Sequence, residues 1–148
     1  MKLSIASLYA CGARSIAVFY NAIGSGSVSP RIVTSGKNGD ATVNNGHGGM
    51  LWYIPKVHLG SITKISTIPS TNLFLTGSKD GDVKLWDVKA AKLVHHRSKL
   101  RGRHTFLQPS SRGFGGVVRA TITDIQVVSR GFLSCGGDGS VKLVQLYD

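Results

Sequence analysis

The chain has 148 residues, with 18 Lys and Arg against 7 acidic residues, which gives a formal net charge of +11. This length is sufficient for one domain with a modest core. All seven acidic residues are Asp and four of them lie in predicted turns. Few carboxylates therefore remain for acid–base catalysis, which uses paired carboxyl groups or His–carboxyl couples in a cleft. The composition argues against an enzyme and leaves binding as the expected activity.

The two cysteines, Cys11 and Cys135, lie far apart, and neither belongs to a Cys-x-x-Cys motif. They indicate neither a disulfide framework nor a zinc site, and they fit a reduced intracellular protein. The first eleven residues imitate a signal peptide, but no small-x-small cleavage site follows them. No uncharged apolar run of about 18 residues occurs, so no transmembrane segment is predicted. We assign no structure to residues 1–14 and expect a cytoplasmic protein.

Residues 15–54 predict a first unit of short strands. A buried strand is expected at Ser15–Ala22, a Gly/Ser-rich loop follows, and a second strand begins at Ile32. A turn is predicted at Lys37–Asp40. Asn and Gly residues at 44–49 then interrupt the pattern, and we interpret them as an exposed, inserted loop.

The middle of the chain carries the clearest pattern. A strand is predicted at Ile62–Ile68 and a β-hairpin at Leu73–Asp87. Two runs of apolar and β-branched residues flank the turn Lys79–Asp82, and Asp-Gly between such runs is the strongest short-range signal for a hairpin. Gly81 in this turn can adopt a positive φ at little cost.

A basic segment follows this hairpin and begins within a possible outer strand at Val88–Val94. No acidic residue interrupts its six cations, which are Lys89, Lys92, Arg97, Lys99, Arg101 and Arg103. Such a run can be a solvated surface, or it can bind an acidic protein, a nucleic acid or an anionic membrane. Phe106 lies beyond the run, so a platform for base stacking is poorly supported.

The last part of the chain begins with a long loop, predicted at Thr105–Val118 from its Pro, Ser and Gly residues. A strand is expected at Ala120–Val128, and the hairpin Phe132–Leu146 ends the pattern. Val144 and Gln145 stand where the middle hairpin has Trp-Asp, and no outer strand follows them.

The same turn occurs three times, and its glycines Gly39, Gly81 and Gly139 lie 42 and 58 residues apart. A period of about 40–45 residues ending in Trp-Asp is the signature of a WD40 propeller blade. The stretch from His58 to Asp87 resembles a WD repeat closely, with His, strand, turn, Ser, Asp-Gly and Trp-Asp in order.

This resemblance implies a hydrogen-bonded structural tetrad at His58, Ser78, Asp80 and Trp86, with Thr76 as an alternative hydroxyl member. A buried indole N–H, a hydroxyl and an imidazole each need a partner. A relay that ends on a carboxylate satisfies all of them.

The resemblance also implies the fold class, an all-β partial WD40 β-propeller of about two to three blades. Residues 15–54 would be a degenerate first blade, 55–104 the central repeat, and 105–148 a degenerate last repeat with a long preceding loop. Closed propellers have about four to eight blades. We therefore expect a piece of a longer protein, whose isolated chain is unstable or self-associates through its unpaired edges.

The last repeat, Phe-Leu-Ser-Cys-Gly-Gly-Asp-Gly-Ser-Val-Lys-Leu, follows a long loop that contains Gly-Phe-Gly-Gly-Val-Val. In these features the chain resembles the C-terminal WD repeats of the DmX-like, or rabconnectin, family. That resemblance implies a non-enzymatic scaffold for protein–protein interaction in assembly of the vacuolar proton-pumping ATPase, peripheral on endomembrane vesicles. It implies no cofactor.

Other interpretations of the same residues are weaker. A Ser–His–Asp hydrolase lacks a visible nucleophile elbow and oxyanion hole. A metal cluster at His95, His96 and His104 is disfavoured, because adjacent residues of a strand point to opposite faces. No phosphate-binding Gly-x-x-x-x-Gly-Lys-Ser/Thr motif occurs. The alternative function that stays open is a basic WD-repeat protein associated with nucleic acid.

Overall fold

The computed structural model describes residues 14–19, 30–46, 49–88, 92–93, 105–108 and 116–146. All regular structure in these ranges is antiparallel β-sheet, which confirms the predicted all-β class. Within the same ranges, no helix is long and apolar enough to cross a membrane.

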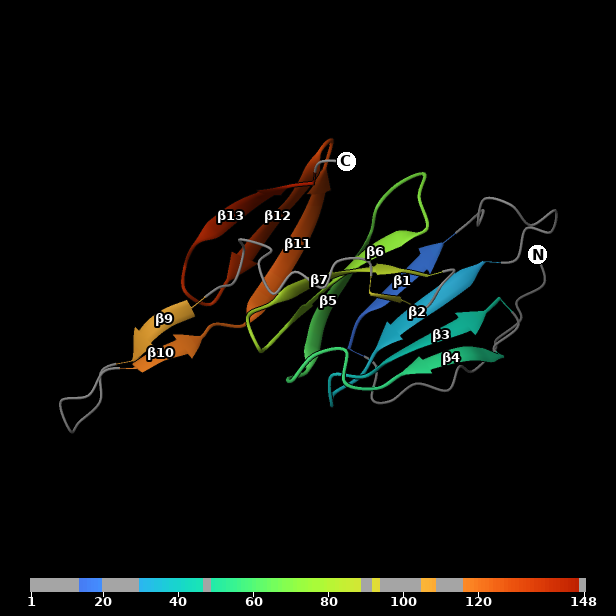
Figure 1. Cartoon of the computed structure of the whole chain (residues 1–148), viewed down its shortest axis with the longest axis horizontal. Helices are drawn as coiled ribbons and strands as arrows, with labels where there is room; N and C mark the ends of the chain where they lie inside the picture. Colours follow the sequence, from blue (N-terminus) through green and yellow to red (C-terminus); the bar gives the residue numbers. More distant parts are fainter. Residues whose placement is uncertain are drawn as a thin grey trace, which may run out of the picture.

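Three of the four sheets in the described ranges lie side by side along the long axis of the molecule (Figure 1). The first has the order β1-β2-β3-β4, with strands Ile16–Phe19, Arg31–Ser35, Ala41–Asn45 and Met50–Ile54. The second has the order β5-β6-β7-β8, with strands Ile62–Thr67, Leu73–Ser78, Val83–Asp87 and Lys92–Leu93. The third has the order β11-β12-β13, with strands Ile122–Val128, Gly131–Gly136 and Val141–Gln145. The strands of these three sheets fall within residues 15–54, 55–104 and 105–148, respectively.

The three predicted hairpin turns are confirmed. Gly39, Gly81 and Gly139 have φ values of 83°, 81° and 76°, in the left-handed region that favours glycine. Each of these turns joins the second strand of its sheet to the third. The recurrent Gly therefore fixes the same strand reversal three times.

The middle sheet packs against a neighbour on each face, because successive side chains of a strand point in opposite directions. Phe74 of β6 belongs to a buried cluster with Phe19 and Val33 of the first sheet. The next residue, Leu75, belongs to a second cluster with Ile122 of the third sheet. One strand thus contributes to both interfaces.

The first strands of the sheets are also joined by side-chain hydrogen bonds. Thr63 Oγ1 of β5 donates to the carbonyl of Ile122 at 2.5 Å, and Ser66 Oγ donates to the carbonyl of Ile125 at 3.1 Å. These bonds tie β5 to β11 without a backbone ladder. The hydroxyl residues of β5 therefore help to set the position of the third sheet.

Gly77 of β6 allows the third sheet to approach closely. A Cβ atom at this position would lie 2.6 Å from Ile122 Cγ2 and 3.0 Å from Ile125 Cδ1. The first of these distances is shorter than real Cβ contacts, so a larger residue would push β11 away from the middle sheet. The close approach explains a glycine inside a strand.

Two sequence-based predictions were wrong. The predicted loop at Thr105–Val118 contains a hairpin of two paired strands, β9 (Thr105–Gln108) and β10 (Gly116–Arg119). The Pro, Ser and Gly residues of 109–115 dominated our interpretation, although apolar residues such as Phe106 and Val117 flank them. Figure 1 shows this hairpin at the end of the molecule that lies farthest from β4.

The second error concerns 44–49, which we interpreted as an inserted loop. Asn44 and Asn45 instead end β3, and β4 pairs with β3 directly after a short turn. The Asn45 N–H donates to the Gly49 carbonyl at 2.8 Å, and the Gly49 N–H donates to Asn45 Oδ1 at 2.9 Å. Asn45 and Gly49 are therefore part of a hairpin connection inside the first sheet, and residues 47–48 lie outside the described residues.

Candidate functional site

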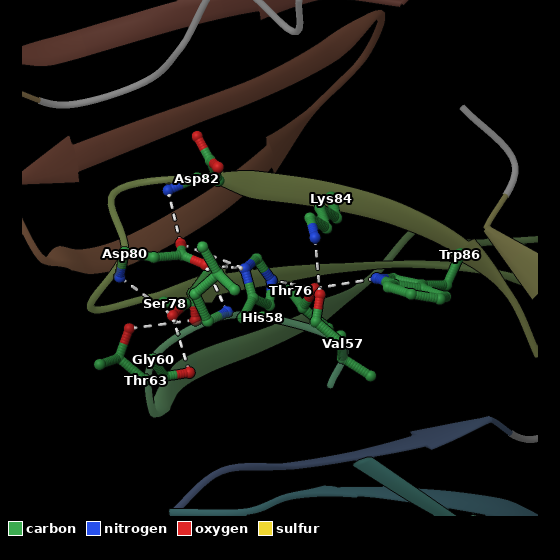
Figure 2. Close-up of polar contacts among 12 residues, drawn as sticks. Val57, His58, Gly60, Thr63, Thr76, Ser78, Asp80, Asp82, Lys84 and Trp86 are labelled. Carbon is green, nitrogen blue, oxygen red and sulfur yellow. Dashed lines mark hydrogen bonds and ion pairs between the residues drawn. The ribbon is translucent and has the colours of Figure 1, made fainter. Parts of the chain in front are cut away.

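The polar side chains of the middle repeat converge from four places in the chain (Figure 2). Thr76 lies on β6 and Trp86 on β7, Asp80 lies in the turn between them, and His58 precedes β5. The His58 backbone is held by the first sheet, since its N–H donates to the Gly39 carbonyl at 3.1 Å. Two sheets therefore position the imidazole.

The four side chains form one continuous relay. Trp86 Nε1 donates to Thr76 Oγ1 at 2.9 Å, and Thr76 Oγ1 lies 2.7 Å from His58 Nε2. His58 Nδ1 lies 3.0 Å from Asp80 Oδ2. An indole only donates and a carboxylate only accepts, so Thr76 Oγ1 accepts from Trp86 and His58 Nδ1–H donates to Asp80. When the imidazole is neutral, its Nε2 accepts from the Thr76 hydroxyl.

Asp80 also caps its own turn. It accepts hydrogen bonds from the backbone N–H groups of Leu59 at 3.0 Å and Asp82 at 2.9 Å. Burial raises the pKa of Asp80, but the hydrogen bond and charge of His58, together with these two N–H groups, outweigh it. The pKa of Asp80 falls to about 2, from an ordinary value of 3.8. The carboxylate is therefore the anionic end of the relay at neutral pH.

The structure corrects the predicted tetrad at its hydroxyl member, which is Thr76 rather than Ser78. Ser78 Oγ donates to the Gly60 carbonyl at 3.0 Å and accepts from the Asp80 N–H at 3.1 Å. The reason is register, because Trp86 pairs with Phe74, so the indole can reach Thr76 two residues along the same face. Ser78 lies at the end of β6, beside the turn.

The relay is sealed from solvent. His58, Thr76, Asp80 and Trp86 have exposed fractions of 1%, 0%, 8% and 7%. A substrate could not reach the imidazole without opening the interface with the first sheet. The arrangement can therefore hold two strands, a turn and the preceding segment together, but it cannot serve as a nucleophile–base couple.

In the sequences of the two flanking units, the positions that correspond to this relay are only partly filled. When the turn glycines are superposed, Thr34 and Ser134 stand at the place of Thr76, but Asn44 and Val144 replace the indole. In the first sheet, Thr34 and Thr42 hydroxyls contact each other at 2.5 Å, and Asn44 Nδ2 lies 3.5 Å from Thr42 Oγ1. The middle repeat is thus the structural anchor of the described chain.

Only one of the six predicted partner-binding residues, Lys92, lies among the described residues. Lys92 belongs to β8, which pairs with β7 through Asp87↔Lys92 and Trp86↔Leu93. The other five cations, Lys89, Arg97, Lys99, Arg101 and Arg103, lie outside the described residues. His95, His96 and His104 also lie outside them. Among the described residues, no group of three or more His, Cys, Asp or Glu side chains could hold a metal ion.

Sequence reasoning missed a groove of about 370 Å³ between the first strands of the three sheets. Side chains from β1, β5 and β11 line it, including Ile16, Val18, Lys64, Ser66, Gln126 and Val127. Lys64 Nζ lies 3.2 Å from Asp124 Oδ1 beside it, so part of its charge is neutralised. The groove forms because three strands from separate parts of the chain lie side by side. No local sequence motif indicates that arrangement.

The low pKa of Asp80 predicts an acid limit to stability. Asp80 titrates near 2 in the folded chain and near 3.8 when unfolded, so its contribution is fully present above pH 3.8 and is lost as pH falls towards 2. We expect the urea midpoint to fall over this window by more in the wild type than in Asp80→Asn, which cannot titrate. Equal pH dependence of the two proteins would contradict the assignment.

The chain matches the WD40 family model, described as WD domain, G-beta repeat, over residues 51–87. It is 30% identical over 111 residues to the serine/threonine-protein kinase VPS15 of Komagataella pastoris, covering 72% of this chain and 7% of that protein. It is 27% identical over 95 residues to DmX-like protein 1 of Mus musculus, covering 62% of this chain and 3% of that protein. The chain therefore spans less than a tenth of the length of these two relatives.

Two designed proteins have similar structures. The computationally designed Ika4 protein has a TM-score of 0.58 at 18% identity, over 99% of this chain and 100% of that chain. The computationally designed Ika8 protein has a TM-score of 0.52 at 18% identity, over 90% of this chain and 46% of that chain. At this identity the likeness concerns the fold alone. Together with the family match, it confirms the expected partial β-propeller.

Proposed function

We propose that this chain, a WD40-repeat protein with the fold of a partial β-propeller, is a non-enzymatic scaffold in assembly or regulation of the vacuolar proton-pumping ATPase. WD40 repeats generally bind other proteins and are generally not enzymes. The finer assignment rests on the resemblance to the DmX-like family. By that resemblance, the partners are proton-pump assembly subunits, and the protein acts in the cytoplasm, peripheral on endomembrane vesicles.

The observation that carries the proposal is the burial of the His58–Asp80 couple. It is the acid–base pair of the described residues that most resembles catalytic machinery, and its imidazole is 1% exposed behind the first sheet. A sealed couple supports a structural role. Rigid sheets that project their loops and outer strands to solvent are suited to binding.

The basic segment from Lys89 to Arg103 is the proposed contact surface. Six cations fall within fifteen residues, and no acidic residue lies among them. Within this segment, β8 (Lys92–Leu93) pairs with β7 next to the anchored Trp86. A concentrated positive charge on a rigid frame favours rapid association with an acidic partner surface.

Charge reversal of the segment tests this proposal in the full-length protein. All six residues, Lys89, Lys92, Arg97, Lys99, Arg101 and Arg103, are changed to Glu, and we expect loss of co-purification with pump subunits and of vesicle acidification. A matched comparison reverses only Arg97, Lys99, Arg101 and Arg103, against a control that reverses the exposed residues Arg14, Lys37, Lys56 and Arg130. The control changes the net charge equally and should retain pump association.

Nucleic-acid association is the second candidate function, supported by the net charge of +11. If the six cations contact phosphates, affinity for duplex DNA or RNA should fall about 10³-fold between 50 and 200 mM salt. Protein association through a packed interface should change far less. Unchanged pump association in the six-residue variant, together with lost salt-sensitive binding of nucleic acid, would replace the pump proposal with this one.

A further inference from the structure

Among the strands that the structure describes, the third sheet has one fewer than either of the other two large sheets. In the first and second sheets the third strand is followed along the edge by β4 or β8. In the third sheet, among the strands that the structure describes, β13 ends the order. The repeat therefore provides a place for a fourth strand beside β13.

Alternate residues of β13 point their backbone N–H and C=O groups towards this edge. The Gly136 N–H donates to the Ser140 carbonyl at 3.2 Å, and hydrogen-bonded pairs alternate along an antiparallel ladder. Ser134↔Lys142 and Phe132↔Val144 are then the bonded pairs between β12 and β13. Val141 and Leu143 consequently present their N–H and C=O groups to the far side.

The same two residues carry exposed apolar side chains. Val141 is 68% exposed and Leu143 is 57% exposed. Their equivalents in the middle sheet, Val83 and Leu85, are 5% and 3% exposed, because the third sheet covers them. An outer strand with apolar side chains and outward backbone groups is a template for pairing with another strand.

We propose that β13 pairs antiparallel with β13 of a second copy of this chain, around a two-fold axis at Leu143, to give one continuous six-stranded sheet. An antiparallel two-fold arrangement places Leu143 opposite Leu143 and Lys142 opposite Val144 of the other copy. Lys142, the one charged residue of β13, therefore does not lie opposite Lys142 of the other copy. This matters for a chain with a net charge of +11, since like charges directly opposite each other destabilise a sheet.

Sedimentation equilibrium of the 148-residue chain tests the pairing, at protein concentrations from about 1 μM to about 1 mM, because so small an interface should be weak. We expect a dimer that dissociates on dilution. Leu143→Pro removes an outward N–H without breaking the β12–β13 ladder, and Leu143→Lys places charges at the axis. Each should weaken dimerisation about tenfold or more. Leu59→Lys, at a residue that is 85% exposed elsewhere, should dimerise like the wild type.

A cross-linking experiment tests the register directly and does not depend on affinity. In a background of Cys11→Ser and Cys135→Ser, Leu143→Cys should form an intermolecular disulfide on oxidation, because the two Cα atoms lie about 5.5 Å apart in a bonded pair. Val141→Cys is the control. Its two copies would be four residues out of register, about 13 Å apart, which exceeds disulfide reach.

The possible results separate clearly. A concentration-dependent dimer with cross-linking at 143 and not at 141 supports the pairing. A wild-type chain that stays monomeric to 1 mM, Leu143 variants that dimerise as the wild type does, or cross-linking at 141 alone would each overturn it. Far-UV circular dichroism of the Leu143 variants checks that a lost dimer does not reflect a lost fold.

Discussion

Phe74→Ala is expected to lower the free energy of unfolding by about 3–5 kcal/mol, the usual cost of removing a fully buried aromatic ring. Phe74 is 1% exposed, and its ring packs edge-on against Phe19, with centroids 5.9 Å apart and an interplanar angle of 70°. The change would leave a cavity between the first and middle sheets, where β6 supplies the contact. Urea denaturation followed by circular dichroism measures the loss.

Ile16→Ala is the matched control for this experiment. Ile16 lies in the first sheet, on the same strand as Phe19, the ring partner of Phe74. However, 59% of Ile16 is exposed. Its truncation should change stability by less than about 0.5 kcal/mol. If Phe74→Ala also cost less than about 1 kcal/mol, the two sheets would not pack as described here.

Asp80→Ala is expected to cost about 1–3 kcal/mol, because it leaves one buried and two partly buried donors without an acceptor. The donors are His58 Nδ1–H and the backbone N–H groups of Leu59 and Asp82. The loss should appear as a lower midpoint of thermal unfolding. Because the imidazole then has no anchor, the bonds through Thr76 to Trp86 should weaken as well.

Asp82→Ala provides the comparison in the same turn. Asp82 gives its backbone N–H to Asp80, and this bond does not need the Asp82 side chain. The variant keeps the turn, loses the same charge and should unfold close to the wild-type temperature. A loss of stability equal to that of Asp80→Ala would show that charge or turn propensity, rather than the relay, explains the effect.

The hairpins could be predicted because their information is local. Asp-Gly or Asn-Gly between β-branched and apolar runs specifies both the reversal and the positive φ of Gly39, Gly81 and Gly139. The relay could be predicted only in part. Choosing Thr76 over Ser78 requires the β6–β7 register, in which Trp86 lies opposite Phe74. Spacing within one strand does not contain that information.

The prediction of a loop at 105–118 was wrong for a different reason. In 105–118, the apolar ends of the hairpin are only four residues long each, so the Pro, Ser and Gly residues between them outweighed the strand signal. The groove beside Lys64 and Ile16 depends on the packing of three strands from separate repeats. The roles of Gly77, Thr63 and Ser66 could not be predicted either, because they depend on contacts with β11, which is distant in the sequence.

The position of β6 between two interfaces also shapes how the chain opens. Each sheet of a repeat array touches only its neighbours, so either outer sheet can separate while the rest stays folded. The middle sheet cannot unfold without exposing Phe74 on one side and Leu75 on the other. Local unfolding should therefore proceed from both ends inward, and the amide hydrogens of β6 should be among the slowest to exchange with solvent.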